Sequence, residues 1–291
     1  MNEKRESGGL RLVVGRGERA FWGFWKGLVI AFGMLIILGP MYLVAANSFK
    51  TLDEASRNFF APPLHFTLNN VRELVASQNY FRYVGNSAVI SVVSMVLVVL
   101  FVPLVSYALA RNQRRRYYRF VYHYVMLGLF IPSQVIMLPI VKQMSSLSLM
   151  NHTGLILLYL TFSLTRGVFL FVNYIRALPV EIEEAARIDG CSVLQTYFRV
   201  VVFLIRPMIA TLVIMDFLWY WNDFQLPLFI LNKSRNLWTL PLFQYNFKTE
   251  YSFDYPMAFT AYLVALVPVL VVYCLCQKHI INGLTAGAVK S

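Results

Sequence analysis

Two groups of charged side chains in this apolar chain have a placement that could support chemistry. The stretch Pro179–Pro207, which reads PVEIEEAARIDGCSVLQTYFRVVVFLIRP, holds three Glu and one Asp around a central Gly. Arg166, Asp216 and Asp223 form the second group, because each interrupts a long apolar run. Charges inside such runs are costly and mark either a polar pathway or a structural ion pair. The elements that position these residues therefore have to be identified first.

The sequence lacks the residue spacings that common catalytic motifs require. The sequence has no G-x-x-x-x-G-K-[ST], H-E-x-x-H or G-x-S-x-G pattern. The histidines and the cysteines are scattered without metal-ligand spacing: His65, His123, His152, His279, Cys191, Cys274 and Cys276. We expect no catalytic residue, no metal and no cofactor. A membrane-embedded enzyme, which would need clustered His, Asp or Glu, is disfavoured.

Composition predicts a membrane protein. Of 291 residues, 58% are hydrophobic and 14% are charged, whereas soluble domains carry about a quarter charged residues. Apolar runs of about 20 residues predict spanning helices. We expect an all-α polytopic fold with six spans: Trp25–Ala46, Asn86–Ala110, Phe120–Val141, Thr153–Ile175, Met208–Leu231 and Met257–Cys276. The sequence therefore predicts one six-helix unit over residues 25–280, preceded by the segment 1–24 and followed by the tail 281–291.

Charge sets the orientation of these spans. The Arg111–Arg119 loop holds five Arg and no acid, whereas the Val141–Asn151 connection has only Lys142. Basic loops favour the cytoplasmic side, so both termini and Pro179–Pro207 are predicted to be cytoplasmic in a cell membrane. The net charge of +12 is clustered between apolar runs, which favours lipid rather than nucleic acid as the partner.

The acidic segment carries the signals of a helix, a turn and a second helix. Pro179 suits the first position of a helix, and Gly190 suits the left-handed residue that ends one. Ser192 with Gln195 predicts a capping box for the helix that follows. A surface helix rich in Glu would be repelled by anionic lipid. We therefore expect residues 179–190 to dock in a groove of another protein.

The segment Glu184–Gly190, EAARIDG, resembles the EAA motif of permease subunits of binding-protein-dependent ABC importers. Further pieces in the family's order are similar to the MalG-like subunits of its carbohydrate-uptake branch: NSAVISVV at 86–93, SYALAR at 106–111, IPSQVIMLPI at 131–140, WNDFQLPL at 221–228 and NGLTAGAVKS at 282–291. The chain departs from that pattern at Phe203, where the family often has Pro.

The resemblance implies an ATP-driven importer assembled from several chains. The expected partners are a second, MalF-like permease, two ATP-binding cassette subunits, an extracytoplasmic solute-binding protein and a sugar. The coupling helix 179–190 would dock on an ATPase subunit through Glu184, with Ala185 and Ala186 packing closely, Asp189 bracing the turn and Gly190 forming it. The tail residues that would reach between the ATPase subunits are Gly283, Leu284, Thr285 and Gly287.

The charges within the spans leave two interpretations open. Asp216 and Asp223 are seven residues apart and would share one helix face, so with Trp221 and Asn222 they could line or gate a hydrated sugar path. For Arg166 we favour a structural role, in which it either pairs with an acid across a helix interface or lies near the cytoplasmic edge and extends its charge toward water. The outer segment Phe59–Asn70 is a candidate docking face for the binding protein or a plain ordered loop. An ion-coupled secondary transporter or channel remains the alternative function, although it would leave the acidic segment unexplained.

Overall fold

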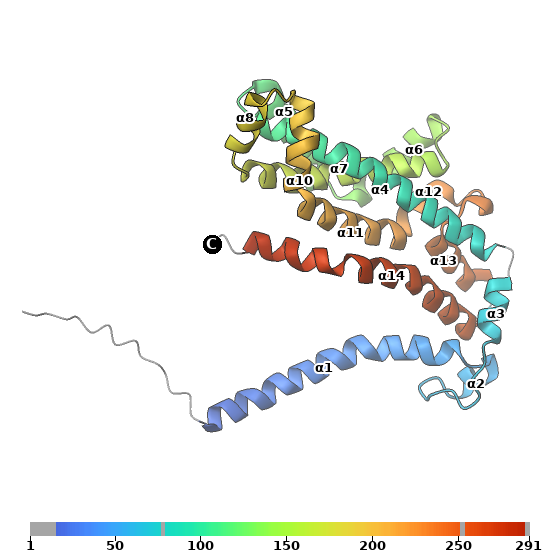
Figure 1. Ribbon diagram of the computed structural model, residues 1–291. Coiled ribbons are helices and arrows are strands. Elements are labelled where there is room, and N and C mark those ends of the chain that lie inside the picture. The colour runs from blue at the N-terminus through green and yellow to red at the C-terminus, as the bar shows by residue number, and fades with distance from the viewer. Residues whose placement is uncertain (1–15, 77–78, 251–253, 289–291) are drawn as a thin grey trace, which may run out of the picture.

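The chain folds into long helices that run side by side. The computed structural model describes residues 16–76, 79–250 and 254–288, and every regular element among them is helical. Four helices form the bundle: α4 (Tyr80–Arg111), α7 (His152–Arg176), α11 (Arg206–Asn222) and α14 (Tyr255–Ala288). Helix α1 (Arg16–Ser48) meets α14 at one end and diverges from it toward the other (Figure 1).

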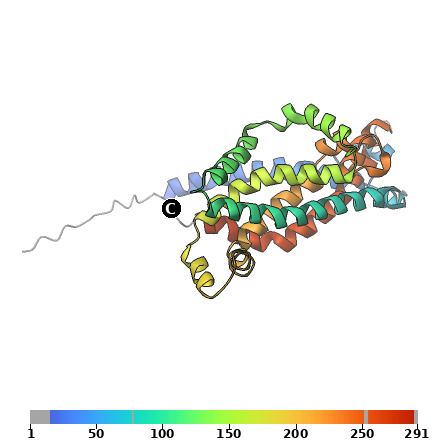
Figure 2. The same ribbon diagram turned by 90° about the horizontal axis from the view of Figure 1, so that it is seen from above.

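Shorter helices lie at the two ends of the bundle. At the end where α1 finishes lie α2 (Leu52–Arg57), α3 (Asn69–Ala76), α12 (Gln225–Leu231), η3 (Arg235–Leu237) and α13 (Leu240–Glu250). At the end nearest the C-terminus lie α5 (Arg116–Leu127), α8 (Glu181–Ile188), α9 (Val193–Thr196), η2 (Tyr197–Val201) and α10 (Val202–Leu204). Helix α6 (Ser133–Ser146) continues from α5 toward the end where α1 finishes, and the two helices arch beside α7 (Figure 2).

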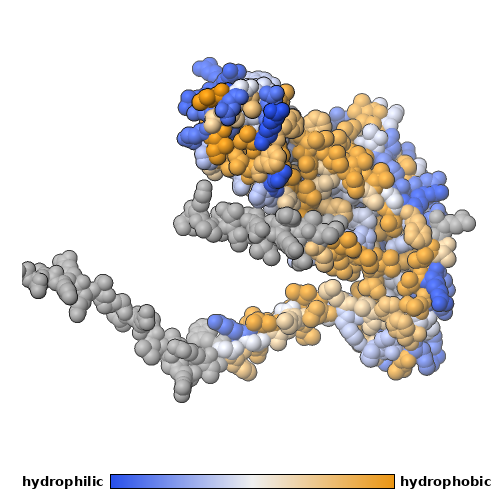
Figure 3. All heavy atoms as spheres, viewed as in Figure 1, coloured by the Kyte–Doolittle hydropathy of each residue, from blue (hydrophilic) through white to orange (hydrophobic). Residues whose placement is uncertain are grey.

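Three described helices are long and apolar enough to cross a membrane: Gly23–Ser48, Tyr80–Arg111 and His152–Arg176. Two bent helix pairs raise that number to five if each pair is one span. The expected fourth span differs from α7 by one residue at each end. The surface is apolar along α1 and the middle of the bundle and polar toward its ends (Figure 3), as a membrane protein requires.

The expected third span is wrong as a single helix. Helix α5 continues through η1 (Gly128–Phe130), and α6 then departs at 107°. Ile131 is extended at the break, because the ring of Pro132 disfavours helical geometry in the residue before it. This apolar run therefore makes a bend rather than a straight crossing.

The expected fifth span is also interrupted. Helix α11 stops at Asn222, Asp223 is extended, and α12 begins at Gln225. The Asp223 carboxylate accepts a hydrogen bond from the Gln225 amide at 3.0 Å, which stabilises the break. Non-helical backbone at such a place is tolerated in membranes where it is buried in protein or lines a cavity.

The core is centred on the pairing of α4 with α7. Gly167 of α7 allows this approach, because a Cβ built there would lie 2.4 Å from the Val102 Cγ1 atom. Val102, Val168, Phe171 and Val172 are fully buried around this contact. This tight pair forms a rigid centre to which the functional elements attach.

Candidate functional site

Helix α8 has a buried face and an exposed face. Glu183 and Ala186, three residues apart, are buried against the chain itself, which helical spacing explains. Glu184, Ala185 and Asp189 are exposed. The prediction that Ala185 and Ala186 both offer close packing to a partner is therefore wrong for Ala186, which is used inside the chain.

The buried Glu183 fastens α8 to α4. Arg111 Nη2 and Nε lie 2.6 and 2.8 Å from Glu183 Oε1, and Tyr107 Oη donates to Glu183 Oε2 at 2.8 Å. The Arg111 side chain also donates to the Leu178 carbonyl at 3.3 Å. Charge-assisted bonds of this kind are shorter and stronger than neutral ones. They link α8 mechanically to the end of a bundle helix.

The turn after α8 follows the sequence prediction. Gly190 has φ +86°, which confirms it as the left-handed residue. The Cys191 amide donates to the Ala186 carbonyl and the Gly190 amide donates to the Arg187 carbonyl, which together form a Schellman motif. Asp189 provides the C-cap of α8 through its backbone. The C-terminus of α8 is thus fixed by local backbone bonds.

Both helix starts in this segment are also defined. Ser192 and Gln195 form the predicted capping box at the start of α9. The start of α8 differs from the prediction, because Val180 is the N-cap and its carbonyl accepts the Glu183 and Glu184 amides. Pro179 therefore precedes the helix instead of occupying its first position.

The second helix of the segment is irregular where the sequence predicts a continuous one. It passes from α9 into the π-helix η2 and then α10, and it meets α11 at 74°. Tyr197 of η2 is buried with its ring centroid 5.3 Å from that of Tyr107. Arg206 Cζ lies 4.0 Å from the centroid of the Phe203 ring, so Phe203 packs at the bend.

The exposed face of α8 is partly apolar. Ile182 is exposed, and Ile188 has 87% of its surface exposed. With Ala185 these residues follow a spacing of three along one side of the helix. Ile182, Ala185 and Ile188 thus form a small, partly apolar exposed strip on α8, with the exposed Glu184 and Asp189 near it.

A second polar cluster joins α7 to α11 inside the bundle. Arg166 Nη2 lies 2.6 Å from Asp216 Oδ1, Ser163 Oγ bonds to Tyr220 Oη, and Tyr159 Oη donates to Asp223 Oδ2 at 2.9 Å. The α7 members are spaced four and three residues apart, and so are those from Asp216 to Asp223. This polar seam shows that Arg166 pairs with an acid across a helix interface, which is one of the two structural roles expected for it.

The polar seam changes the interpretation of Asp216. Its surface is fully buried, and Tyr220 Oη adds a second bond at 3.4 Å. The Arg166 guanidinium also lies 4.6 Å from the centroid of the Trp219 ring. Asp216 is therefore a structural partner in this arrangement and is not exposed to a path.

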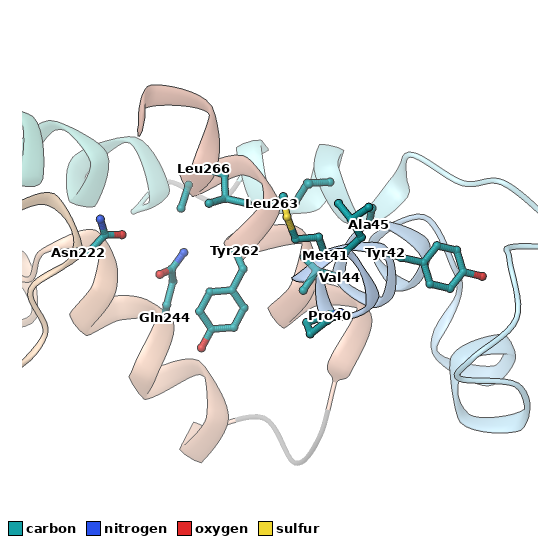
Figure 4. A pocket seen from close by; sticks show the side chains of 12 residues that line it. Pro40, Met41, Tyr42, Val44, Ala45, Asn222, Gln244, Tyr262, Leu263 and Leu266 are labelled. Carbon is teal, nitrogen blue, oxygen red and sulfur yellow. The ribbon is translucent and has the colours of Figure 1, made fainter. Parts of the chain in front are cut away.

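The expected path residues do not converge on one site. Trp221 is buried on the other side of α11, where its Nε1 donates to the Ala265 carbonyl of α14 at 3.3 Å. Asn222 is exposed and lines a cavity of about 600 Å³ between α1 and α14. Figure 4 shows Asn222, Gln244 and Tyr262 on one side of it, with Met41 and Val44 of α1 opposite. Asp223 accepts its hydrogen bond from Tyr159 of α7.

The predicted C-terminal contact residues Gly283, Leu284, Thr285 and Gly287 belong to the last turns of α14. Their side chains lie outside the part that the structure describes. No group of three potential metal ligands occurs among the described residues.

Sequence reasoning missed the role of Glu183. The three Glu at the start of α8 look alike in the sequence, and the partner Arg111 is 72 residues away. A signal was present in the spacing, because Glu183 and Ala186 are three residues apart and share a face that lies opposite Ile188.

Comparison with a sequence profile of the family described as "Binding-protein-dependent transport system inner membrane component" gives a match over residues 102–285. The chain is similar to the multiple sugar-binding transport system permease protein MsmG of Streptococcus mutans, with 44% identity covering 92% of this chain and 97% of that protein. It is 32% identical to the probable starch degradation products permease AmyC of Thermoanaerobacterium thermosulfurigenes, covering 88% and 93%.

The fold resembles that of a chain in a bacterial ABC transporter that imports alginate. The TM-score is 0.80 at 20% identity, covering 91% of this chain and 98% of that one. A second structure of an alginate transporter, in complex with an alginate-bound periplasmic protein, matches with a TM-score of 0.71 at 14% identity, covering 90% and 95%. These similarities extend over nearly the whole length of both chains.

Proposed function

Because the chain belongs to the family of binding-protein-dependent transport system inner membrane components, we propose that it is a permease subunit of an ATP-driven sugar importer. It would form half of the translocation path for a sugar delivered by an extracytoplasmic binding protein. The observation that carries the proposal is the match, over nearly the full chain, to permeases named for sugar uptake. An importer subunit moves its cargo without altering it, so it needs no catalytic residue.

The geometry of α8 supports a coupling role. We assign its exposed face, with Glu184, Ala185 and Ile188, to a cleft on an ATP-binding cassette subunit. Glu184 would pair with a basic residue there, while the two apolar side chains pack against the cleft. Gly190 sets the turn, and Asp189 stands at its edge. Two such cassettes would supply the ATP hydrolysis for which this sequence has no phosphate loop.

The buried face of α8 explains how motion would pass into the bundle. A displacement of α8 by the ATPase must move Arg111 and Tyr107, because Glu183 bonds to both. These residues lie in the last turns of α4, which packs tightly on α7. The pair would then move as one body between two packings of the permease, which is how a differential contact biases a two-state transporter.

The break at the end of α11 is the most suitable place for a path or gate in this chain. Asn222 keeps an exposed amide beside a cavity, and Asp223 has left the helix. Asp216 and Trp221, by contrast, are buried, Asp216 in its ion pair with Arg166 and Trp221 against α14. We therefore assign Asn222 and Asp223 to the path or its gate.

The proposed assembly is a heterodimer of permeases with both termini in the cytoplasm. The chain would have six spans within residues 25–280, the cytoplasmic segments 1–24 and 281–291, and the coupling helix at 179–190. The basic Arg111–Arg119 connection and α8 lie at the same end of the bundle, which supports a cytoplasmic position for that end.

Purification of the tagged chain from native membranes in mild detergent, followed by mass spectrometry, tests the proposal. We expect a cassette ATPase, a second permease and a solute-binding protein to copurify. A tagged unrelated permease from the same membranes is the control. Purification of the chain alone, together with sugar uptake driven by an ion gradient without ATP, would instead support a secondary transporter.

A further inference from the structure

The segment Phe59–Phe66 lies alongside the end of α1 rather than extending away from the bundle. It follows α2 and turns back along α1 (Figure 1). The Asn47 amide donates to the Phe59 carbonyl at 3.0 Å, and the Phe59 ring lies 5.9 Å from that of Phe259 on α14. Further along, the rings of Phe66 and Phe49 stack with centroids 4.7 Å apart. The segment is held at both of its ends.

A buried lysine fixes the start of this segment. Lys50 has 0% of its surface exposed. Its ammonium donates to the carbonyls of Asn58 at 2.8 Å and Ala61 at 2.6 Å, and to the Asn47 side chain at 3.3 Å. A buried charge is tolerated only when hydrogen bonds replace its water. Lys50 thereby folds the chain after α2 back onto α1 and is a positioning residue for the segment.

Along most of the segment, half-buried side chains that face the protein alternate with exposed side chains. Phe59, Ala61 and Pro63 are half-buried. The intervening residues form an exposed apolar strip, in which Phe60 is 74%, Leu64 76% and Phe66 64% exposed and which also includes Pro62. His65 is the one polar side chain between Phe59 and Phe66.

The depth of the apolar strip is fixed by a contact with α1. Tyr42 Oη donates to the Phe60 carbonyl at 3.1 Å, and Tyr42 precedes the end of α1 at Ser48 by six residues. At the helical rise, six residues correspond to about 9 Å. Phe60 therefore lies level with the side of a spanning helix rather than beyond its end. The charged α2, with its exposed Asp53–Arg57 ion pair, occupies the opposite, polar side.

We propose that the apolar strip of Phe60, Pro62, Leu64 and Phe66 inserts into the lipid interface at the end of the bundle where α1 finishes. In the topology proposed above this is the outer leaflet. Tyr and Trp are enriched at membrane interfaces; Tyr42 holds the strip at this level, where Phe60, Leu64 and Phe66 supply exposed apolar surface. A binding protein would dock on the aqueous side, where α2 lies, and would not reach a surface level with Tyr42.

Spin labelling in the complete complex, reconstituted in phosphatidylcholine–phosphatidylglycerol nanodiscs, tests this placement. Cys191, Cys274 and Cys276 are first replaced by Ser. Single labels are then placed at Phe60→Cys and Leu64→Cys, with Ser56→Cys on the exposed side of α2 as the matched control. Power saturation compares collisions with oxygen, which partitions into lipid, and with a water-soluble nickel chelate.

We expect oxygen collisions to dominate at positions 60 and 64 and nickel collisions to dominate at position 56. Nickel access at positions 60 and 64 equal to that at 56 would overturn the proposal in favour of an aqueous loop. Low collision rates with both reagents, or rates that fall when the binding protein is added, would overturn it in favour of a protein contact. In a Lys50→Met background, the label at position 64 should become more mobile and gain nickel access, because the carbonyls lose their common donor.

Discussion

Replacement of Glu183 by Gln tests the mechanical link between α8 and α4. The change keeps the side-chain volume and one acceptor oxygen but removes the charge that Arg111 and Tyr107 contact at 2.6–2.8 Å. A hydrogen bond to a charged group contributes about 1.5–3 kcal/mol. Gln retains part of the Tyr107 bond, so we expect α8 to lose about 2 kcal/mol of local stability, mainly at Arg111.

Hydrogen exchange of α8 amides measures this loss directly. At about 1.36 kcal/mol per tenfold, the expected loss corresponds to exchange roughly 30-fold faster in the Glu183→Gln variant. Glu184→Gln is the matched control, because it makes the same substitution one residue along, on an exposed side chain. Its α8 amides should exchange at the wild-type rate.

The reasoning would be refuted by wild-type exchange in Glu183→Gln, or by an equal acceleration in Glu184→Gln. The second result would mean that the charge of the helix N-terminus matters more than the contact with Arg111. Exchange in α7 serves as the internal reference and should be unchanged in both variants.

Three further changes have defined outcomes in thermal unfolding of the purified protein. Asp216→Ala leaves Arg166, whose side chain is 36% exposed, without its acid and should cost about 1–3 kcal/mol. The double replacement of Asp216→Leu with Arg166→Met should avoid most of that loss; an equally large loss would contradict a purely structural pair. Gly167→Ala forces a Cβ to 2.4 Å from Val102 and should cost about 1–3 kcal/mol, whereas Gly85→Ala, with nothing within 4 Å, should not destabilise. Ser192→Ala removes the capping box and should cost about 1 kcal/mol, with Ser192→Asp restoring it; equal stability of both variants would count against the cap.

Local signals in the sequence predicted the parts of the fold that local physics determines. Gly190 and the Ser192–Gln195 box were confirmed because a left-handed turn and a helix cap depend on neighbouring backbone atoms. The fourth apolar run forms the single helix α7 that was expected, because no break interrupts it. Hydropathy could not predict the bend at Pro132 or the break at Asp223. A run of apolar residues can continue without a polar gap even where the helix that it forms is interrupted.

Contacts between distant helices were only partly predictable. The cost of a charge in a span predicted a structural role for Arg166 but left open whether it pairs with an acid. The equal spacing of the polar residues in α7 and at the end of α11 would have indicated the full polar seam. Asp216 and Asp223 were grouped because residues seven apart share a helix face, and both do face α7. Trp221 and Asn222, which were placed with them, face other neighbours. Glu183 was missed because its partner lies in another helix.

The central claim is that this chain couples a separate ATPase to transport through the exposed face of α8. The most direct measurement is uptake of the sugar bound by the copurified binding protein, in proteoliposomes that contain the whole complex with ATP enclosed. We predict ATP-dependent uptake by the wild type and its loss in Glu184→Arg, with the helical content and thermal stability of that variant unchanged. Full ATP-dependent uptake by Glu184→Arg, or equal wild-type uptake without ATP, would contradict the account.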